Sequence, residues 1–309
     1  MRPACRGFTL TEILLSTAIL GLIVVLLARS VNSVNLITTS ATKRIETEAQ
    51  VRPIFDRMAI DYAQMVKRAD VDFFGKGTAS GGLMAGNDRI AFFSTVPGDY
   101  PSTGSSSPFS LVSYKINSSV AAANTAVFTR LQRMARGLLM NGDANANNGS
   151  FPTMTDGPVI FSPVSIQGVW GTTVTSNATT DSKHELFGPN IIRLEYYYLL
   201  TNGAFSIVPW DPSIAGHTNA AGLRDVGAIV VAVAAVDPKT RVSFSNSTVA
   251  TIAGTLVDYS PGHGPGWLTK QWRSALDSPT NATVRGLPAP AVAAIRVSER
   301  YFYLSPTLQ

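Results

Sequence analysis

The 309-residue sequence predicts an α+β protein, in which a long N-terminal α-helical spine packs on an antiparallel β-sheet-rich globular domain. Three observations predict this class. An apolar run opens the chain, apolar residues then recur every three or four positions, and later segments alternate with a period of two. The predicted organisation is a leader over residues 1–7, a transmembrane and assembly helix over 8–28, the outer half of the spine over 29–69, and the β-rich domain over 70–309.

The apolar run extends from Phe8 to Ala28, which at the helical rise is about 31 Å and enough to cross a bilayer. Arg2 and Arg6 precede it, so the positive-inside bias predicts a cytoplasmic leader and a C-terminal domain across the membrane. The single cysteine, Cys5, lies in the leader. Once the leader is removed, the exported domain must depend on its apolar core without disulfides.

Glu12 is a carboxylate inside this apolar run. At bilayer depth an ionised carboxylate costs about 2.5–3.5 kcal/mol, so it implies a partner. Cleavage after Gly7 would free the α-amine of Phe8, and Glu12 of a neighbouring subunit could pair with that ammonium. A plain signal anchor or a secretory signal also has a basic start and an apolar centre, but neither explains Glu12.

The sequence Arg6-Gly7-Phe8-Thr9-Leu10-Thr11-Glu12 resembles the prepilin-type signal of type IV pilins and type II secretion pseudopilins. The resemblance implies cleavage after Gly7 by a prepilin peptidase, methylation of Phe8, and subunit register set by Glu12. It also implies a pilin-like globular domain and a structural role in an envelope filament. The expected partners are the prepilin peptidase, other pilin or pseudopilin subunits and the inner membrane, with the domain periplasmic or extracellular.

The helical pattern continues past the membrane run, which predicts one helix from Phe8 to about Arg68 with its outer half packed on the domain. Pro53 should kink this helix or break it near Val51-Arg52, because proline lacks the backbone N–H and crowds the preceding turn. The apolar positions that carry the period are Val31, Val34, Ile37, Ala41, Ile45, Ala49, Phe55, Met58, Tyr62, Met65 and Ala69.

Strands are expected in the remaining chain. One spans residues 89–93, and a pair spans 111–116 and 126–131. Another covers 192–200, with Ile192, Leu194, Tyr196, Tyr198 and Leu200 on one face, and a turn leads from it into 205–208. Residues 226–236 are apolar on both faces, which predicts a central strand, and 295–303 form a closing strand.

Short motifs narrow the resemblance. Tyr114-Lys115 and the segment 194–198 are similar to the larger minor pilins and the J-type minor pseudopilin. Residues 230–238 and 295–304 resemble the C component of the Verru_Chthon cassette, a group of uncharacterised prepilin-like proteins. This narrower resemblance adds no known activity. The size of the chain, larger than that of a typical major pilin, favours a tip or initiating subunit.

The charge pattern gives no indication of nucleic-acid binding. The chain carries 25 basic and 20 acidic residues, a net charge of +5 that falls to +3 once Arg2 and Arg6 are removed. No dense basic stripe interleaved with aromatic residues is present in the sequence. No nucleic-acid partner is therefore expected.

Catalytic chemistry is not predicted either. The sequence offers no nucleophile–base constellation, and its three histidines, His184, His217 and His263, are scattered. We therefore expect no enzyme activity, no metal centre and no cofactor. One candidate calcium loop has oxygen ligands at Asp143, Asn145 and Asn147. Met154 replaces the bidentate acid of such loops, so an exposed polar turn is the competing interpretation.

A second function remains open from the sequence alone: a membrane-tethered periplasmic binding module for an exported protein or glycan. Its ligand face would use tryptophans, which are Trp170, Trp210, Trp267 and Trp272. Tryptophans spread this widely are more often core or interface residues. Such a module would be indifferent to the identity of residue 12, whereas a filament subunit would not.

Overall fold

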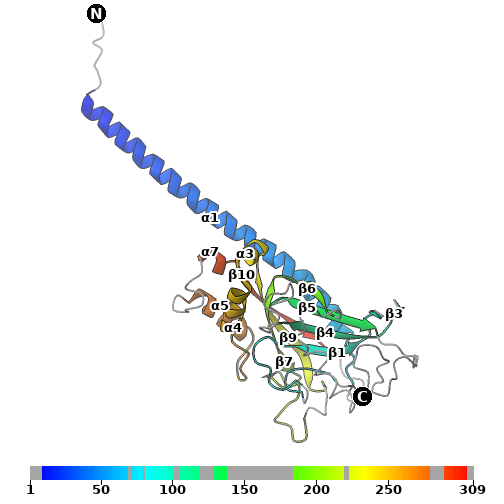
Figure 1. Cartoon of the computed structure of the whole chain (residues 1–309). Helices are drawn as coiled ribbons and strands as arrows, with labels where there is room; N and C mark the ends of the chain where they lie inside the picture. Colours follow the sequence, from blue (N-terminus) through cyan, green and yellow to red (C-terminus); the bar gives the residue numbers. More distant parts are fainter. Residues whose placement is uncertain are drawn as a thin grey trace, which may run out of the picture. The chain divides into compact units, whose positions relative to one another are not determined.

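The computed structural model describes residues 9–68, 71, 73–78, 81–100, 105–117, 129–137, 184–218, 223–278 and 289–304. They form a long N-terminal helix, α1 (Leu10–Ala63), followed by two sheets and four short helices, so the chain is α+β (Figure 1). The chain divides into two compact units, Met1–Ile45 and Glu46–Gln309. The division falls inside α1, whose last turns belong to the second unit.

Helix α1 confirms the predicted long helix and lacks the break near Val51-Arg52, which was one of the two effects predicted for Pro53. It continues through Pro53 without a break and ends at Ala63, before the predicted Arg68. Pro53 lies on the exposed side of the helix, where water can solvate the carbonyl that loses its donor. Its neighbours Val51 and Ile54 are buried in the core. Tertiary packing of the flanking turns therefore holds the helical register across the proline.

The first sheet has the strand order β1-β4-β5-β2-β3, with β6 also paired to β5. Its pairings are antiparallel except for β2 with β5, which is parallel. The strands are β1 (Ile90–Ser94), β2 (Gly98–Tyr100), β3 (Ser105–Ser107), β4 (Ser110–Ile116), β5 (Leu131–Gly137) and β6 (Glu185–Gly188). Strands β1 and β4 confirm the predictions for residues 89–93 and 111–116.

The predicted strand over residues 126–131 fails at Thr129 and Arg130, which form a turn. Residues 126–128 lie outside the described residues, and the partner of β4 is β5, which begins only at Leu131. Thr129 has φ 48°, in the left-handed region, and its N–H donates to the carbonyl of Asn117 at 2.7 Å. The ladder between β4 and β5 therefore starts at the pair Ile116 and Leu131, later than the alternation of apolar residues indicated.

The second sheet is antiparallel with the order β10-β9-β7-β8. It contains β7 (Ile191–Leu200), β8 (Phe205–Ser206), β9 (Val226–Val236) and β10 (Ile295–Tyr303). Strand β9 pairs with a strand on each side and is buried on both faces, so the prediction of a central strand is confirmed. Strand β10 confirms the predicted closing strand.

A register shift in β7 corrects one predicted face. The pairing of β7 with β9 slips between Ile191 and Arg193. The extra residue places Ile191 on the face of Leu194 and Tyr196, while Ile192 joins the opposite cluster. The predicted alternation therefore holds from Leu194 onward and fails at Ile192.

The described residues between β9 and β10 form four short helices that were not predicted. They are α3 (Pro238–Ser243), α4 (Asn246–Thr255), α5 (Trp267–Asp277) and α7 (Ala289–Val292). Asp237 and Ser245 cap the first two by accepting backbone N–H groups, which is a strong local helix start. Figure 1 shows α4 and α5 next to each other beside the second sheet.

The main core lies between the end of α1 and the two sheets. Apolar side chains of α1 reach both sheets, including Met58 and Tyr62, and Tyr62 stacks on Phe92 of β1. A second cluster joins the other face of β7 and β9 to α4 and α5, with Trp272 fully buried. The prediction that the outer part of the spine packs on the domain is confirmed from Thr47 onward, whereas Ile45 is exposed.

Candidate functional site

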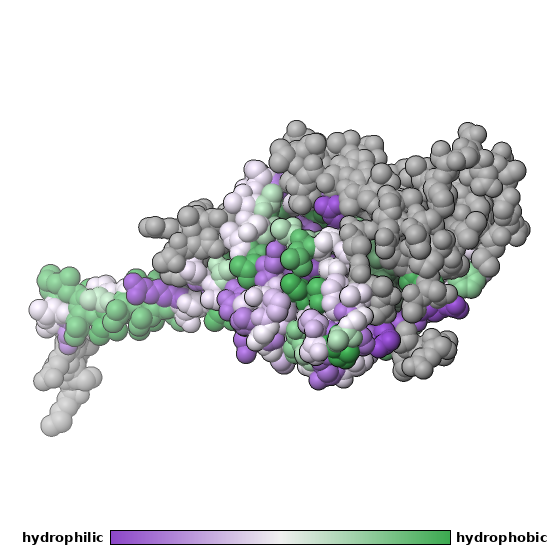
Figure 2. Space-filling view, turned by 90° about the horizontal axis from the view of Figure 1, so that it is seen from below, coloured by the Kyte–Doolittle hydropathy of each residue, from purple (hydrophilic) through white to green (hydrophobic). Residues whose placement is uncertain are grey.

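The first half of α1 carries a continuous apolar surface. Leu14, Leu20 and Leu27 are each about three-fifths exposed, and the most apolar stretch of this helix buries nothing within the structure. Figure 2 shows this surface coloured as hydrophobic along much of the helix. By length and composition the helix is able to cross a membrane. An exposed helix with this much apolar surface is suited to a lipid or protein environment.

Glu12 lies in the first turn of this helix and folds back on its N-terminus. Its Oε2 accepts the backbone N–H and the hydroxyl of Thr9, both at 2.9 Å, and the N–H of Glu12 is 3.3 Å from Thr9 Oγ1. This reciprocal arrangement is a capping box, in which two side chains satisfy backbone donors that a helix start leaves open. The signature T-x-x-E was present in Thr9–Glu12, and the sequence reasoning missed it.

Of the predicted processing and assembly residues, the structure therefore places only Glu12. Gly7 and Phe8 lie outside the described residues, as do the calcium candidates Asp143, Asn145 and Asn147. Among the described residues, no group of three or more His, Cys, Asp or Glu side chains is arranged to hold a metal ion. Trp170 also lies outside them.

The described histidines are held by neighbouring groups. In His217, Nδ1 is 2.6 Å from Asp225 Oδ2 and Nε2 is 2.6 Å from Arg224 Nη2, so both ring nitrogens have a partner. His184 Nε2 lies 3.4 Å from Ser113 Oγ. His263 packs against Trp267 with ring centroids 4.0 Å apart. His184 is the one described histidine whose contact here is a serine hydroxyl, but Ser113 is fully buried and His184 is only 5% exposed, so a substrate has no access to this pair.

A buried cluster of charged groups lies where the turn after α1, the start of β1 and strand β7 meet. Lys76 Nζ is 2.6 Å from Asp88 Oδ2 and also donates to Glu195 Oε1. The Lys76 side chain is 3% exposed, and both carboxylates are fully buried. Sequence reasoning missed this cluster because its members are far apart in the chain and belong to no motif.

Burial governs the ionisation of the cluster. Burial and the neighbouring Glu195 raise the pKa of Asp88 well above its ordinary value, and burial also raises the pKa of Glu195. Burial alone would lower the pKa of Lys76, but the two carboxylates raise it. Arg193 extends the network from the other side of Glu195 and pairs with Asp258. Arg193 lies 3.6 Å from Glu195 and not beside Asp88, so the tendency to hold a proton is stronger at Asp88.

A second buried cluster joins α1 to the first sheet. Arg133 Nε and Nη2 donate to the two oxygens of Asp61 at 2.8 Å and 3.0 Å, and the hydroxyl of Tyr114 donates to the same carboxylate. Burial and the charge of Asp61 raise the pKa of Tyr114 well above its ordinary value. The bidentate geometry fixes the rotation of α1 on the sheet.

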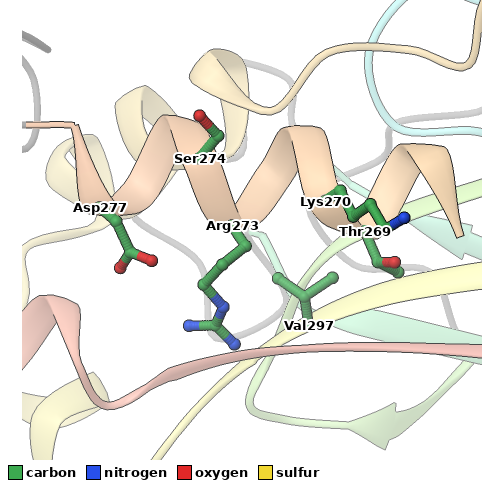
Figure 3. Close-up of a pocket in the computed structure, with 6 residues that line it drawn as sticks. All are labelled: Thr269, Lys270, Arg273, Ser274, Asp277 and Val297. Atoms are coloured by element: carbon green, nitrogen blue, oxygen red, sulfur yellow. The ribbon is translucent and has the colours of Figure 1, made fainter.

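A cavity of about 420 Å³ opens between α5 and β10. Figure 3 shows Arg273, Asp277 and Val297 directed toward the space between the helix and the strand. Arg273 Nη1 donates to the carbonyl of Ile295 at 3.2 Å, so this guanidinium anchors the helix to the strand. The cavity is lined by Thr269, Lys270, Arg273, Ser274, Asp277 and Val297, and none of these is a histidine or cysteine.

No protein-family model, curated protein or solved structure matches the chain.

Proposed function

We propose that the chain is a structural minor pilin or pseudopilin-like subunit that is assembled into, or primes, an envelope filament of the type II secretion or type IV pilus kind. A prepilin peptidase cleaves after Gly7 and the new N-terminal Phe8 is methylated. The protein is then held in the inner membrane by α1, with the domain periplasmic or extracellular. Its role is assembly and not catalysis.

One observation supports this proposal above the others: the exposed and predominantly apolar stretch of α1 up to Ala28 carries a single charged residue, Glu12, in its first turn. The apolar surface suits both lipid and the helices of neighbouring subunits. An ionised carboxylate is unfavourable in lipid unless an oppositely charged group pairs with it. The free ammonium of a neighbouring Phe8 supplies that partner during assembly.

The capping box gives Glu12 a second role that the experiment must separate from assembly. Glutamine satisfies a capping box as glutamate does, because its side-chain oxygen accepts the same N–H. Glu12→Gln therefore keeps the helix start and removes the charge. Glu12→Ala removes both.

The experiment combines mass spectrometry of the mature N-terminus with a filament assay. The mature wild-type protein should begin at Phe8 with one added methyl group, and Gly7→Ala should impair cleavage. Glu12→Gln and Glu12→Ala should both be cleaved, yet neither should assemble. If Glu12→Gln assembles normally and Glu12→Ala does not, Glu12 acts as a helix cap only. A mature chain that retains its first seven residues would contradict the proposal as a whole.

The membrane-tethered binding module stays as the second candidate because some aromatic side chains are partly exposed. Trp267 is half-buried beside His263, and Tyr303 is 71% exposed. Trp272, in contrast, is a core residue. A module for an exported protein or glycan would lose binding in Trp267→Ala and keep it in Glu12→Gln, which is the reverse of the assembly phenotype.

A further inference from the structure

The cluster of Lys76, Asp88 and Glu195 brings an amine and a carboxyl group into contact where water is excluded. Hydrogen bonds hold the backbone in place at both Lys76 and Asp88. The Asp88 N–H donates to the Leu194 carbonyl at 2.9 Å, and the Tyr198 hydroxyl donates to the Lys76 carbonyl at 2.9 Å. A pair of reacting groups fixed in this way behaves as if at very high local concentration.

The two oxygens of Asp88 are in different situations. Oδ2 accepts the Tyr196 N–H at 2.8 Å and lies 2.6 Å from Lys76 Nζ. Oδ1 is buried and has no hydrogen-bond partner among the described residues. An N–H on Oδ2 stabilises negative charge that develops there during nucleophilic attack. The unsatisfied Oδ1 is the atom that can leave.

We propose that Lys76 and Asp88 condense into an intramolecular isopeptide bond, with Glu195 moving the protons. The proposal concerns the globular domain and does not depend on the proposed function of the chain.

The reaction balances without any co-reactant. Glu195 first takes a proton from the Lys76 ammonium, which leaves a neutral amine beside the protonated carboxyl of Asp88. Nζ attacks Cγ, and the charge that develops on Oδ2 is stabilised by the Tyr196 N–H. Glu195 passes its proton to the hydroxyl at Oδ1 and then takes a second proton from the nitrogen. The Cγ–Oδ1 bond breaks, one water leaves, and Glu195 ends neutral; nothing is oxidised or reduced.

The surroundings favour the product. A buried ammonium and carboxylate carry a large desolvation penalty, and condensation replaces them with a neutral amide and a neutral carboxylic acid. Burial raises the pKa of Asp88, which favours the protonated carboxyl from which Oδ1 can leave as water. The Tyr196 ring lies beside the lysine, with Nζ 5.6 Å from the ring centroid. The aromatic ring shields the new amide bond from water.

The experiment is a peptide map of the full chain, purified in detergent, then denatured and digested with trypsin. With the bond, cleavage after Lys76 is lost, and residues 69–89 appear as one peptide that is lighter by one water. Lys67 is the internal control, because it is half-buried and donates to the Val226 carbonyl, and no carboxylate of the described residues is paired with it. Cleavage at Lys67-Arg68 should be complete.

Two near-isosteric variants identify the chemistry. In Glu195→Gln the proton acceptor is gone, so bond formation should slow by about 10²–10⁴-fold and the two separate peptides should appear. In Asp88→Asn the leaving group becomes ammonia, so the linked peptide should be lighter by one ammonia instead of one water. Circular dichroism verifies that each variant is folded.

The proposal is overturned if folded wild-type protein yields separate peptides for residues 69–76 and 77–89. It is also overturned if a loss of water is found while cleavage after Lys76 proceeds, because dehydration of an aspartate within its own backbone gives that pattern.

Discussion

The ion pair between Asp61 and Arg133 joins α1 to β5 in the interior of the domain, with Asp61 fully buried and the Arg133 side chain 6% exposed. Removal of one partner leaves an uncompensated buried charge. We expect Asp61→Ala to lower the free energy of unfolding by about 3–5 kcal/mol, measured by denaturant titration of the full chain in detergent.

Arg52→Ala is the matched control on the same helix. Arg52 Nε lies 4.0 Å from Asp56 Oδ2, and the Arg52 side chain is 85% exposed. Exposed pairs contribute less than about 1 kcal/mol, so this variant should unfold almost as the wild type does. Equal losses for the two variants would show that Asp61 has no special structural role.

Glu299 should make the stability of the domain depend on pH. Burial raises its pKa above the ordinary value of 4.5, an effect that Tyr197 and the Gly266 backbone offset only in part. Between the unfolded and the folded pKa the folded chain binds more protons, so stability falls as the pH rises through that range. The amide that Glu299→Gln introduces does not titrate.

The wild type and Glu299→Gln should therefore differ least in free energy of unfolding below pH 4.5, and the variant should become relatively more stable as the pH rises above it. Denaturant titrations at several pH values measure this difference. A difference that is constant with pH, or that shrinks as the pH rises, would contradict the assignment.

At the scale of elements, Pro53 tests how far packing overrides local preference. The proline removes one helical hydrogen bond inside α1, yet Val51, Ile54 and Phe55 remain buried around it. Pro53→Ala restores the backbone N–H and should stabilise the domain by about 2 kcal/mol, after the smaller entropic advantage of proline is lost. Thermal melting followed by circular dichroism measures the change. Destabilisation would mean that Pro53 itself is needed for the fit of α1 in the core.

The elements that the sequence predicted well are those with a strong and uninterrupted pattern. Helix α1 and strands β4, β9 and β10 have such patterns, and their positions are confirmed. The short helices were not predicted because their apolar patterns are short and interrupted. Helix α5 buries Leu268, Trp272 and Leu276 at four-residue steps, but only three turns carry this signal and loop-forming residues surround it.

The candidate site was predictable only where it is local in sequence. The capping box of Thr9 and Glu12 could have been predicted from its four-residue sequence signature. The bulge at Ile192 was not, because a register shift depends on the partner strand. The Lys76 cluster was not either, since Lys76 and Glu195 meet only through the fold. Tertiary contacts between distant segments leave no periodic trace in a single sequence.

At the scale of the whole molecule, the two compact units predict where the chain can be cut. The main core takes its α1 side chains from Val51 onward, and the chain before Glu46 forms the other unit. A chain that begins at Glu46 should fold and melt within a few degrees of the full-length protein in detergent. The measurement is a thermal melt of both chains.

A chain that begins at Tyr62 is the matched truncation. It lacks Val51, Ile54, Phe55 and Met58, and loss of a single large core side chain costs about 2–5 kcal/mol. The sum exceeds the stability of a typical domain, so this chain should not fold. If it folds, α1 is an accessory to the core and not a part of it.

The same side chains of α1 that fill the interior belong to the helix that carries the apolar N-terminal surface. Tension applied at the N-terminus would therefore be resisted by the unfolding barrier of the domain, because the helix cannot leave the core without exposing the apolar side chains of both sheets to water. A substitution that loosens Tyr62 or Met58 should therefore both destabilise the domain and speed its unfolding under force.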